Sequence, residues 1–380
     1  MRKISLVYFA DSEKGACYQY RVNNPMQALD QGRFGTQFSE KWKPEFQQAG
    51  DIFTFQRNST KESIQIIYQL HKRNRATVYD MDDDIFQIPE SNPVHDLYLH
   101  SPHIPWHQVI GMRYATAVTV SCQRLKEVYE PINKNIHVLP NCLDDWKGIY
   151  PLLADNGRIR LFWGGSPTHS ADLDLIRSVL VDLSKKHGET IEIIIMGSDS
   201  EKFACPITYM PFGPYSFFQG VMFSCHIGLA PMSDSLFNLG KSDLRLKELG
   251  ASHLPIVASK FGEYDKEESG ALLCKTKNEW YEAIDKLIVN EQFRKSQAEI
   301  CHKWAMSWTI NQHVHLWEKI YEELLGGSPR RSLSKSVTVQ SSKRPPRVSD
   351  GDKIRVGKYA LGGNTVDSSG PNSRFPIVNP

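Results

Sequence analysis

The feature that most constrains the fold of this chain is an alternation of short apolar segments with longer amphipathic segments, which runs through the sequence twice. The clearest apolar segment is Ile191–Met196, a continuous run of the kind that a parallel strand buried on both faces requires. Strands are expected at residues 4–10, 76–79, 117–121, 136–139, 159–163, 191–196, 226–230 and 255–258. Helices are expected at residues 63–71, 123–129, 172–187, 217–224, 242–251, 278–289 and 291–325. Strands that alternate with helices predict the α/β class with open parallel sheets.

The length of the chain and its change in composition predict three segments. The 380 residues are enough for two domains of roughly 100–200 residues each. We expect two Rossmann-like domains that face each other across a cleft, one at residues 1–150 and one at residues 151–325. Residues 326–380 are rich in Ser, Gly, Pro, Lys and Arg, and they cannot bury enough apolar surface to offset the entropy of ordering. We therefore expect this third segment to be a disordered basic tail.

The net charge of +2 hides an asymmetry between the body and the tail. From residue 326 onward, ten Lys and Arg residues stand against three Asp residues, whereas the body carries a small excess of acidic residues. The body therefore gives no electrostatic reason to expect a nucleic-acid-binding domain. The tail, chiefly residues 330–358, fits either contact with a polyanion, such as nucleic acid or an anionic membrane surface, or a solubilising linker.

The cysteines and the N-terminal segment indicate the cellular compartment. Seven cysteines occur and no two form a CxxC pair, so neither a disulfide framework nor a zinc site is expected. The first apolar run meets Asp11 too early for a signal peptide. No stretch approaches the roughly 18–20 apolar residues that span a membrane. We expect a cytoplasmic protein, at most peripheral to the inner face of the membrane.

Two loops of the second series carry residues suited to a nucleotide. In open α/β sheets, ligands bind beyond the carboxyl ends of the strands. The loop Gly164-Gly165-Ser166 allows close backbone approach and leads into a helix, as an anionic diphosphate requires, although a plain tight turn would look the same. It is followed by Pro167, and no phosphate-binding fingerprint of the GxGxxG or P-loop type is present.

The second loop of this kind contains Ser242, a good N-cap residue, so a helix is expected to begin near it. Lys241, Arg245 and Glu248 then fall on one helical face, at spacings of four and seven residues. The cations suit donor phosphates, and the carboxylate can accept both hydroxyls of a ribose. The alternative is a solvated helix face with an Arg–Glu pair.

In the first series, the segment Tyr79–Phe86 carries four carboxylates within five residues at the end of an expected strand. We expect their mutual repulsion to raise their pKa values, so that they supply a base or bind a cation. The alternative is a plain acidic turn. Arg21, in the loop after the first strand, could bind phosphate, bind an acceptor or pair with this acidic segment.

The C-terminal half resembles the donor domain of retaining GT-B glycosyltransferases, and the body as a whole is similar to the group 1, family-four-type enzymes of bacteria and bacteriophages. The segments that carry the resemblance are Tyr20–Val22, Tyr79–Phe86, Val118–Ser121, Leu139–Asn141, Trp163–His169, Ile227–Pro231 and Asp234–Ser259. In the last segment, Glu248 matches the second glutamate of the family motif. Gly240 stands where the first glutamate would fall, so the resemblance does not extend to the donor sugar.

The resemblance implies a set of site residues. The donor would contact Gly164, Gly165, Ser166, Gly197, Tyr215, Lys241, Ser242, Arg245 and Glu248. The catalytic residues would be Asp82, Asp83 and Lys241, and the acceptor would meet Tyr20, Arg21 and Asp84. The nucleotide sugar would be a cosubstrate, with no further cofactor and no metal, because Lys and Arg neutralise the diphosphate. A closing helix within Trp304–Leu325 would cross back to the first domain.

The expected function is transfer of a hexosyl or pentosyl group from a nucleotide-diphosphate sugar to a hydroxyl acceptor, with retention. The acceptor class stays open among polysaccharide, glycolipid, protein and DNA. Alternatives are an epimerase or phosphorylase on the same scaffold, a non-catalytic sugar- or nucleic-acid-binding protein, and a transferase that acts on modified bases of viral DNA.

Overall fold

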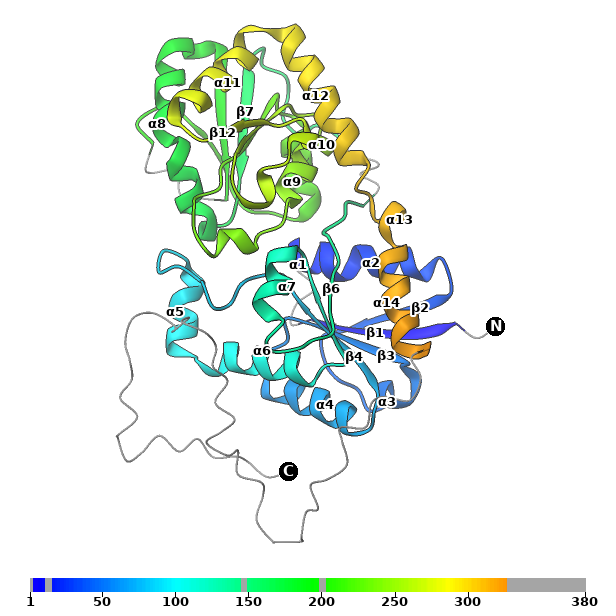
Figure 1. The fold of residues 1–380 in the computed structure, drawn as a ribbon. Helices are drawn as coiled ribbons and strands as arrows, with labels where there is room; N and C mark the ends of the chain where they lie inside the picture. Colours follow the sequence, from blue (N-terminus) through cyan, green and yellow to red (C-terminus); the bar gives the residue numbers. More distant parts are fainter. Residues whose placement is uncertain (1–2, 11–15, 145–148, 198–202, 327–380) are drawn as a thin grey trace, which may run out of the picture.

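The computed structural model describes residues 3–10, 16–144, 149–197 and 203–326. The chain forms two α/β halves, each built on a six-stranded sheet, and the second half lies above the first in Figure 1. Neighbouring strands are parallel throughout both sheets. The expected pair of Rossmann-like domains is therefore confirmed, whereas the expected disordered tail lies outside the described residues. Among the described helices, none is both long enough and apolar enough to cross a membrane.

The first sheet has the strand order β2-β1-β3-β4-β5-β6. Its strands are β1 (Ile4–Ala10), β2 (Phe34–Ser39), β3 (Ile52–Gln56), β4 (Ala76–Met81), β5 (Ala117–Val120) and β6 (Ile136–Val138). The helices of this half are α1 (Ala16–Tyr18), which runs into a π-helical turn (Gln19–Asn23), α2 (Asn24–Asp30), α3 (Phe46–Ala49), α4 (Lys61–Lys72), α5 (Pro93–His100), α6 (His103–Tyr114) and α7 (Gln123–Tyr129). Local sequence starts two of them: Thr60 accepts a hydrogen bond from an N–H of α4, and Asn92 does the same for α5.

The second sheet has the order β12-β11-β10-β7-β8-β9, which is the Rossmann order. Its strands are β7 (Ile159–Gly164), β8 (Ile191–Met196), β9 (Thr208–Met210), β10 (Ile227–Ala230), β11 (Ile256–Ser259) and β12 (Leu272–Cys274). The helices are α8 (Ser170–His187), α9 (Tyr215–Phe223), α10 (Leu244–Ala251), α11 (Lys277–Val289) and α12 (Glu291–Met306). Strand β8 is buried along nearly its whole length, as its continuous apolar run requires.

After α12 the chain returns to the first half through α13 (Ile310–His313) and α14 (His315–Gly326), which lies beside β1 and β2 in Figure 1. Trp317, Ile320 and Tyr321 of α14 are buried in the same apolar cluster as residues of β1. The hydroxyls of Tyr321 and Tyr8 are 2.6 Å apart. The last helix therefore completes the core of the half that the chain builds first.

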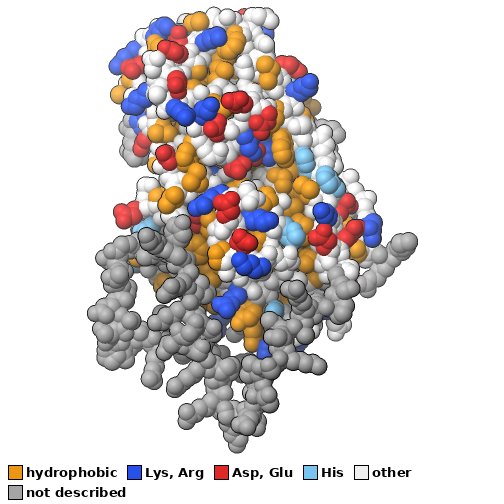
Figure 2. All heavy atoms as spheres, viewed as in Figure 1, with side chains coloured by type: hydrophobic (Ala, Val, Ile, Leu, Met, Phe, Trp, Pro, Cys, Tyr) orange, Lys and Arg blue, Asp and Glu red, His pale blue; other side chains and the backbone are white. Residues whose placement is uncertain are grey.

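Two strands and five helices of the first half have no counterpart among the expected segments: β2, β3, α1, α2, α3, α5 and α6. β2 is a sheet-edge strand with mostly half-buried residues, so its apolar pattern is weak. The expected helix 291–325 is interrupted between α12 and α13, where the chain passes from one half to the other. On the face shown in Figure 2, basic and acidic side chains are interspersed over the described surface, without a large area of one sign.

Candidate functional site

Each sheet has one point at which the chain order reverses, and ligands of open α/β sheets bind at such points. In the second sheet, β7 is followed by β8 on one side, and β10 lies on the other. In the first sheet, β1 is followed by β2 on one side, and β3 lies on the other. The segments that follow β7, β10, β1 and β3, the strands on either side of these two points, contain Gly165, Lys241, Arg21 and Arg57. Gly197 follows the neighbouring strand β8, and the acidic segment begins in β4 and continues beyond its end.

Three expected donor residues, Gly164, Gly165 and Gly197, lie together at the ends of β7 and β8. Gly197 has a φ of 82°, in the left-handed region that favours glycine. A Cβ atom at Gly197 would lie 2.8 Å from the carbonyl oxygen of Gly165. The N–H of Gly165 donates to the carbonyl of Met196 at 3.0 Å. The backbone is thus packed closely here, and Ser166 leads from it toward α8.

Asp172, which the sequence reasoning missed, ties the loops after β7 and β10 together. Its Oδ1 accepts hydrogen bonds from the Ser233 N–H at 2.8 Å, the Ser233 hydroxyl at 2.7 Å and the Asn238 amide at 2.9 Å. Its Oδ2 lies 2.9 Å from His169 Nδ1. Burial raises the pKa of Asp172, but these hydrogen bonds outweigh it and the pKa is lowered. The sequence signal that could have identified Asp172 was its position three residues after His169, in the first turn of an expected helix.

The helix α10 begins two residues later than expected, and the side chains of Ser242 and Asp243 are both engaged elsewhere. The Ser242 hydroxyl accepts a hydrogen bond from the Asn141 amide of the first half at 2.9 Å. Asp243 occupies the N-cap position but caps no N–H group, and its carboxylate pairs with Lys247 and Lys266 at 2.7 Å each. Ser242 therefore links the two halves instead of starting the helix.

Lys241 consequently lies outside the helix, in extended backbone, and the expectation that it shares a helical face with Arg245 and Glu248 is wrong. Its Nζ contacts Asp83 Oδ1 of the first half at 2.5 Å. Arg245, inside the helix, lies 2.9 Å from Glu248 Oε2. Each of the two expected phosphate-binding cations is thus paired with a carboxylate in this structure.

Glu248 is buried where the two halves meet, with 3% of its surface exposed. Its Oε1 accepts a hydrogen bond from the Tyr20 hydroxyl at 2.7 Å, and the Tyr215 hydroxyl contacts that same hydroxyl. Burial raises the pKa of Glu248, against the opposing effects of Arg245 and of the Tyr20 hydrogen bond. Two residues expected at the donor, Glu248 and Tyr215, are therefore in direct contact with Tyr20, which was expected at the acceptor.

Arg21 forms a buried ion pair with Asp80, the first carboxylate of the acidic segment. Arg21 donates through Nη2 at 2.5 Å and through Nε at 3.0 Å to the two oxygens of Asp80, and Thr119 donates to the same carboxylate at 2.6 Å. Arg21 also donates to the Leu139 carbonyl and to the Asn141 side chain. Of the roles open to Arg21, the structure favours pairing with the acidic segment. Breaking such a buried pair typically costs about 3–5 kcal/mol.

The remaining carboxylates have unlike surroundings, so the expectation that all their pKa values are raised is wrong. Burial raises the pKa of Asp83, but Lys241 and Arg57 outweigh it and hold that pKa well below its usual range. Burial raises the pKa of Asp84 to about 6. The Arg57 guanidinium lies 2.9 Å from Asp83 and 3.5 Å from Asp82. Sequence reasoning missed Arg57 because the strand that directly precedes it, β3, was not among the expected strands.

The three expected acceptor residues, Tyr20, Arg21 and Asp84, are buried and make internal contacts. Their burial leaves almost no exposed surface for an acceptor, so the acceptor surface has to be sought on neighbouring residues. Gly240, which replaces the first glutamate of the family motif, fits closely against the first half. A Cβ atom there would lie 3.0 Å from Leu125 and 3.3 Å from the Cβ of Asp84. A side chain at this position would require Leu125 or Asp84 of the first half to shift.

Among the described residues, no group of three or more His, Cys, Asp and Glu side chains is arranged to hold a metal ion. The cations near the expected donor residues are instead the side chains of Lys241 and Arg245. The arrangement offers glycine backbone, two cations and a buried carboxylate on the second half, and it offers the carboxylates of Asp82 and Asp83 on the first. Chemically, such a set suits a phosphorylated ligand on one side and a hydroxyl group on the other.

No protein-family model matches the chain, and no curated protein matches it. Solved structures with similar folds include an α-glucosyltransferase in complex with UDP and a 13-mer DNA containing an HMU base. That match has a TM-score of 0.58 and 10% identity, and it covers 85% of this chain and 100% of the other.

Anabaena HepE in complex with UDP-glucose has a TM-score of 0.55 and 13% identity, over 85% of this chain and 100% of the other. The trehalose-6-phosphate synthase OtsA has a TM-score of 0.52 and 15% identity, over 73% of each chain. At these identities the likeness establishes the architecture. The chain has the GT-B fold, with two Rossmann-like halves that meet at the loops described above.

Proposed function

We propose that the protein is a glycosyltransferase that moves a sugar from a nucleoside-diphosphate sugar to a hydroxyl acceptor. The observation that carries this proposal is the buried carboxylate of Glu248, which accepts a hydroxyl hydrogen bond from Tyr20 at 2.7 Å. A ribose hydroxyl offers the same donor group. The glycine loops after β7 and β8 would bind the attached diphosphate through their N–H groups. The UDP and UDP-glucose complexes of similar folds support this assignment.

Lys241 and Arg245 are proposed to neutralise the diphosphate. A bound diphosphate would compete with Asp83 for Lys241, and the ribose would take the place of Tyr20 at Glu248. During transfer the bond between the anomeric carbon and the diphosphate breaks, and negative charge grows on the leaving group. Cations at this position therefore stabilise the transition state more than the bound donor.

Asp82 or Asp83 is proposed to orient the acceptor hydroxyl and to take its proton as the acceptor oxygen bonds to the anomeric carbon. Burial raises the pKa of Asp83, but Lys241 and Arg57 lower it by more, so Asp83 stays ionised at neutral pH. A carboxylate that Lys241 releases becomes a stronger base, because an opposing charge has moved away. Retention is included in the proposal on the resemblance of the segment Asp234–Ser259.

The proposal assigns the acceptor to residues 1–150, on which α14 packs, and the donor to residues 151–325. A cytoplasmic location is part of it, and the seven free cysteines support a reducing compartment. A modified base in DNA is a second candidate acceptor. Two observations favour it: one similar fold is in complex with DNA containing an HMU base, and residues 326–380 are strongly basic.

The first test separates donor binding from contact between the halves. Glu248→Gln should weaken binding of UDP and UDP-glucose roughly 10- to 100-fold, because a charge-assisted hydrogen bond contributes about 1.5–3 kcal/mol. Tyr20→Phe removes the hydroxyl partner but keeps the carboxylate, so donor affinity should stay within about threefold. Isothermal titration calorimetry measures both variants. If both variants lost the same donor affinity, Glu248 would serve only the contact between the halves.

Hydrolysis of the donor without an acceptor separates an enzyme from a binding protein on the same fold. The wild-type protein should slowly release sugar from at least one member of a panel of nucleotide sugars, and UDP-glucose is the first to try. Thermal stabilisation by the same panel reports binding even without turnover. Stabilisation with no hydrolysis of any donor would favour the non-catalytic alternative.

A further inference from the structure

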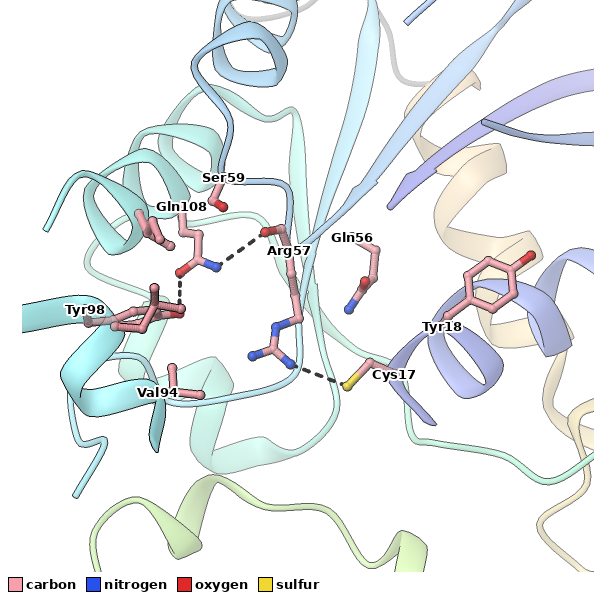
Figure 3. A pocket seen from close by; sticks show the side chains of 10 residues that line it. Cys17, Tyr18, Gln56, Arg57, Ser59, Val94, Tyr98 and Gln108 are labelled. Carbon is pink, nitrogen blue, oxygen red and sulfur yellow. Dashed lines mark hydrogen bonds between the residues drawn. The ribbon is translucent and has the colours of Figure 1, made fainter. Parts of the chain in front are cut away.

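A cavity of about 340 Å³ lies at the point of the first sheet where the strand order reverses (Figure 3). Its walls come from the segments after β1 and β3 and from the helices α5 and α6. This is where an open α/β sheet binds its ligand. The volume is at the lower end of the range for small-molecule sites, so it suits one or two rings rather than a long polymer.

The cavity contains a buried polar group without a partner. Gln56 is 5% exposed, and its Nε2 has no hydrogen-bond partner within the described part of the chain. In Figure 3 the amide nitrogen of Gln56 points into the space between Arg57 and Cys17. Gln108 on the opposite wall is satisfied, since it accepts from the Tyr98 hydroxyl and donates to the Arg57 carbonyl. A buried, unpaired amide is unfavourable unless a ligand or water satisfies it.

The carboxylate of Asp82, which lies next to the lining residues Arg57 and Cys17, offers the complementary group. Asp82 Oδ1 is buried, lies 3.5 Å from Arg57 Nη1 and makes no hydrogen bond to any described residue. Asp82 is close to Cys17. Burial, followed by the negative charge of Asp82, raises the pKa of the Cys17 thiol to about 12. A hydroxyl is the simple group that can accept from an amide N–H and donate to a carboxylate. Gln56 Nε2 and Asp82 Oδ1, the two atoms without a hydrogen-bond partner among the described residues, therefore match a hydroxylated ligand.

The cavity is connected to the donor loop through charged contacts. Arg57, which lines the cavity, lies 2.9 Å from Asp83, and Asp83 lies 2.5 Å from Lys241. The Arg57 backbone has a φ of 56°, in the left-handed region that a non-glycine residue rarely adopts. Its N–H donates to the Asp80 carbonyl, which helps to hold this conformation. A ring in the cavity would thus sit next to the carboxylates proposed to take the acceptor proton.

We propose that this cavity binds the terminal sugar ring of the acceptor, with Gln56 donating to one ring oxygen or hydroxyl and Asp82 accepting from another. The inference rests on the proposed glycosyltransferase function and adds to it the class of acceptor. The apolar side chains of Val94, Leu97 and Ile104 face the ring carbons. A sugar fits better than a hydroxymethylated base, because several hydroxyls on one ring can hydrogen-bond to both Gln56 Nε2 and Asp82 Oδ1 at once.

The test uses Gln56→Leu, which removes the unpaired amide at similar volume, and Gln219→Leu as a matched control. Gln219 is likewise buried, and its Nε2 has no partner among the described residues, but it lies on α9 outside the cavity. Neither variant should lower the melting temperature, because neither loses a hydrogen bond made through Nε2. Gln108→Leu should lower it, since two partners lose their hydrogen bonds.

Transfer from UDP-glucose, or from the panel donor that is hydrolysed, is measured with three probes: methyl glucoside, a maltooligosaccharide and an oligonucleotide with a 5-hydroxymethyl base. With a sugar probe, Gln56→Leu should raise the acceptor KM roughly tenfold and leave donor hydrolysis unchanged. Gln219→Leu should leave the acceptor KM unchanged. An unchanged KM would overturn the assignment. Transfer to the oligonucleotide alone, or to none of the probes while hydrolysis persists, would overturn the sugar acceptor and leave the donor proposal standing. If the wild-type protein neither hydrolyses nor binds any donor of the panel, both the proposed glycosyltransferase function and the sugar acceptor are overturned.

Discussion

At the scale of single residues, adjacent carboxylates acquire different properties from the groups that other segments bring to them. Asp83 lies between Lys241 and Arg57, which hold its pKa well below its usual range against the effect of burial. Asp84, the next residue, is buried with one oxygen accepting from the Phe86 N–H, and burial raises its pKa to about 6. At neutral pH, Asp83 is therefore the more readily ionised of the two, and Asp84 is held in the charged form at a cost in stability.

Asp84→Asn should stabilise the protein at neutral pH and have little effect near pH 4. The folded-state pKa of about 6 is above the ordinary 3.8, so the folded protein binds this proton more tightly than the unfolded chain does. That stabilisation is complete below about pH 4 and is lost as the pH rises through about 6. Asparagine keeps an oxygen for the Phe86 N–H and cannot ionise. Its free energy of unfolding should exceed that of the wild type by up to about 3 kcal/mol near pH 8.

Urea unfolding of both proteins across this pH range measures the difference. A difference that is constant with pH would mean that Asp84 does not titrate in the range, and the pKa argument would fail. The contribution of Asp83 to the free energy of unfolding depends on pH in the opposite way. Because its folded-state pKa is lowered, its stabilising contribution is present above about pH 4 and is lost in acid.

Which loops carry the site could be predicted from the sequence, because glycines and charges follow apolar runs that are plainly strands. Gly165 and Gly197 indeed lie together. How the charges pair could not be predicted, because the partners are far apart in the chain. Arg57 and Lys241 both reach Asp83, and no local pattern relates these three positions. The pKa expectation failed for this reason.

At the scale of elements, predictability followed how distinct each apolar pattern is. Strand β8 and helix α7 have the expected bounds, since one is a continuous apolar run and the other a short amphipathic segment. The start of α10 was misplaced, because Ser242 has the right chemistry for a cap but is engaged by Asn141 of the other half. Tertiary contacts of this kind override local propensity and are invisible in a local pattern.

The turn that ends β8 is predicted to be sensitive at one glycine. Gly197→Ala places a methyl group in left-handed backbone, against the Phe212 ring and 2.8 Å from the Gly165 carbonyl oxygen. It should lower the free energy of unfolding by roughly 2–3 kcal/mol and raise the donor KM. Gly157→Ala is the matched control, with a φ of 71° and no atom within 4 Å of the added carbon.

The control should cost about 1 kcal/mol from backbone strain alone and leave the donor KM unchanged. Denaturant unfolding and donor hydrolysis distinguish the two variants. Equal stabilities and equal donor KM values would show that the close packing against Gly165 contributes nothing, and the role of Gly197 in shaping the donor loop would have to be abandoned.

At the scale of the whole molecule, two of the contacts that join the two halves converge on Asn141. The Asn141 side chain accepts from Arg21 and donates to Ser242, and its carbonyl accepts from Lys247 at 2.9 Å. Lys247 is completely buried, although it carries a charge. The presence of two α/β halves could be predicted from the alternation of strands and helices. Their mutual packing could not, because it depends on single polar contacts across a large separation in sequence.

The distribution of charge over the whole molecule leads to a prediction about the tail. The helix α14 ends at Gly326 on the first half, the half that carries the proposed acceptor cavity, so residues 327–380 are attached there. Ten Lys and Arg residues against three Asp residues make this segment the basic part of a chain whose body has an acidic excess. If the segment binds nucleic acid, its removal should weaken duplex DNA binding and flatten the dependence of log K on log salt by about 0.9 for each phosphate that the segment neutralises.

Fluorescence anisotropy of a labelled duplex at several salt concentrations, with the full chain and with a chain that ends at residue 326, measures both effects. Calorimetry with UDP serves as the control, because the donor residues all precede α14 and their affinity should not change. Unchanged DNA affinity and slope would make the segment a linker. A polycationic segment and a base-reading site both bind DNA, so only the salt slope separates the two. Salt weakens the binding of phosphates by cations, whereas it has much less effect on the hydrogen bonds that hold a ring in the cavity.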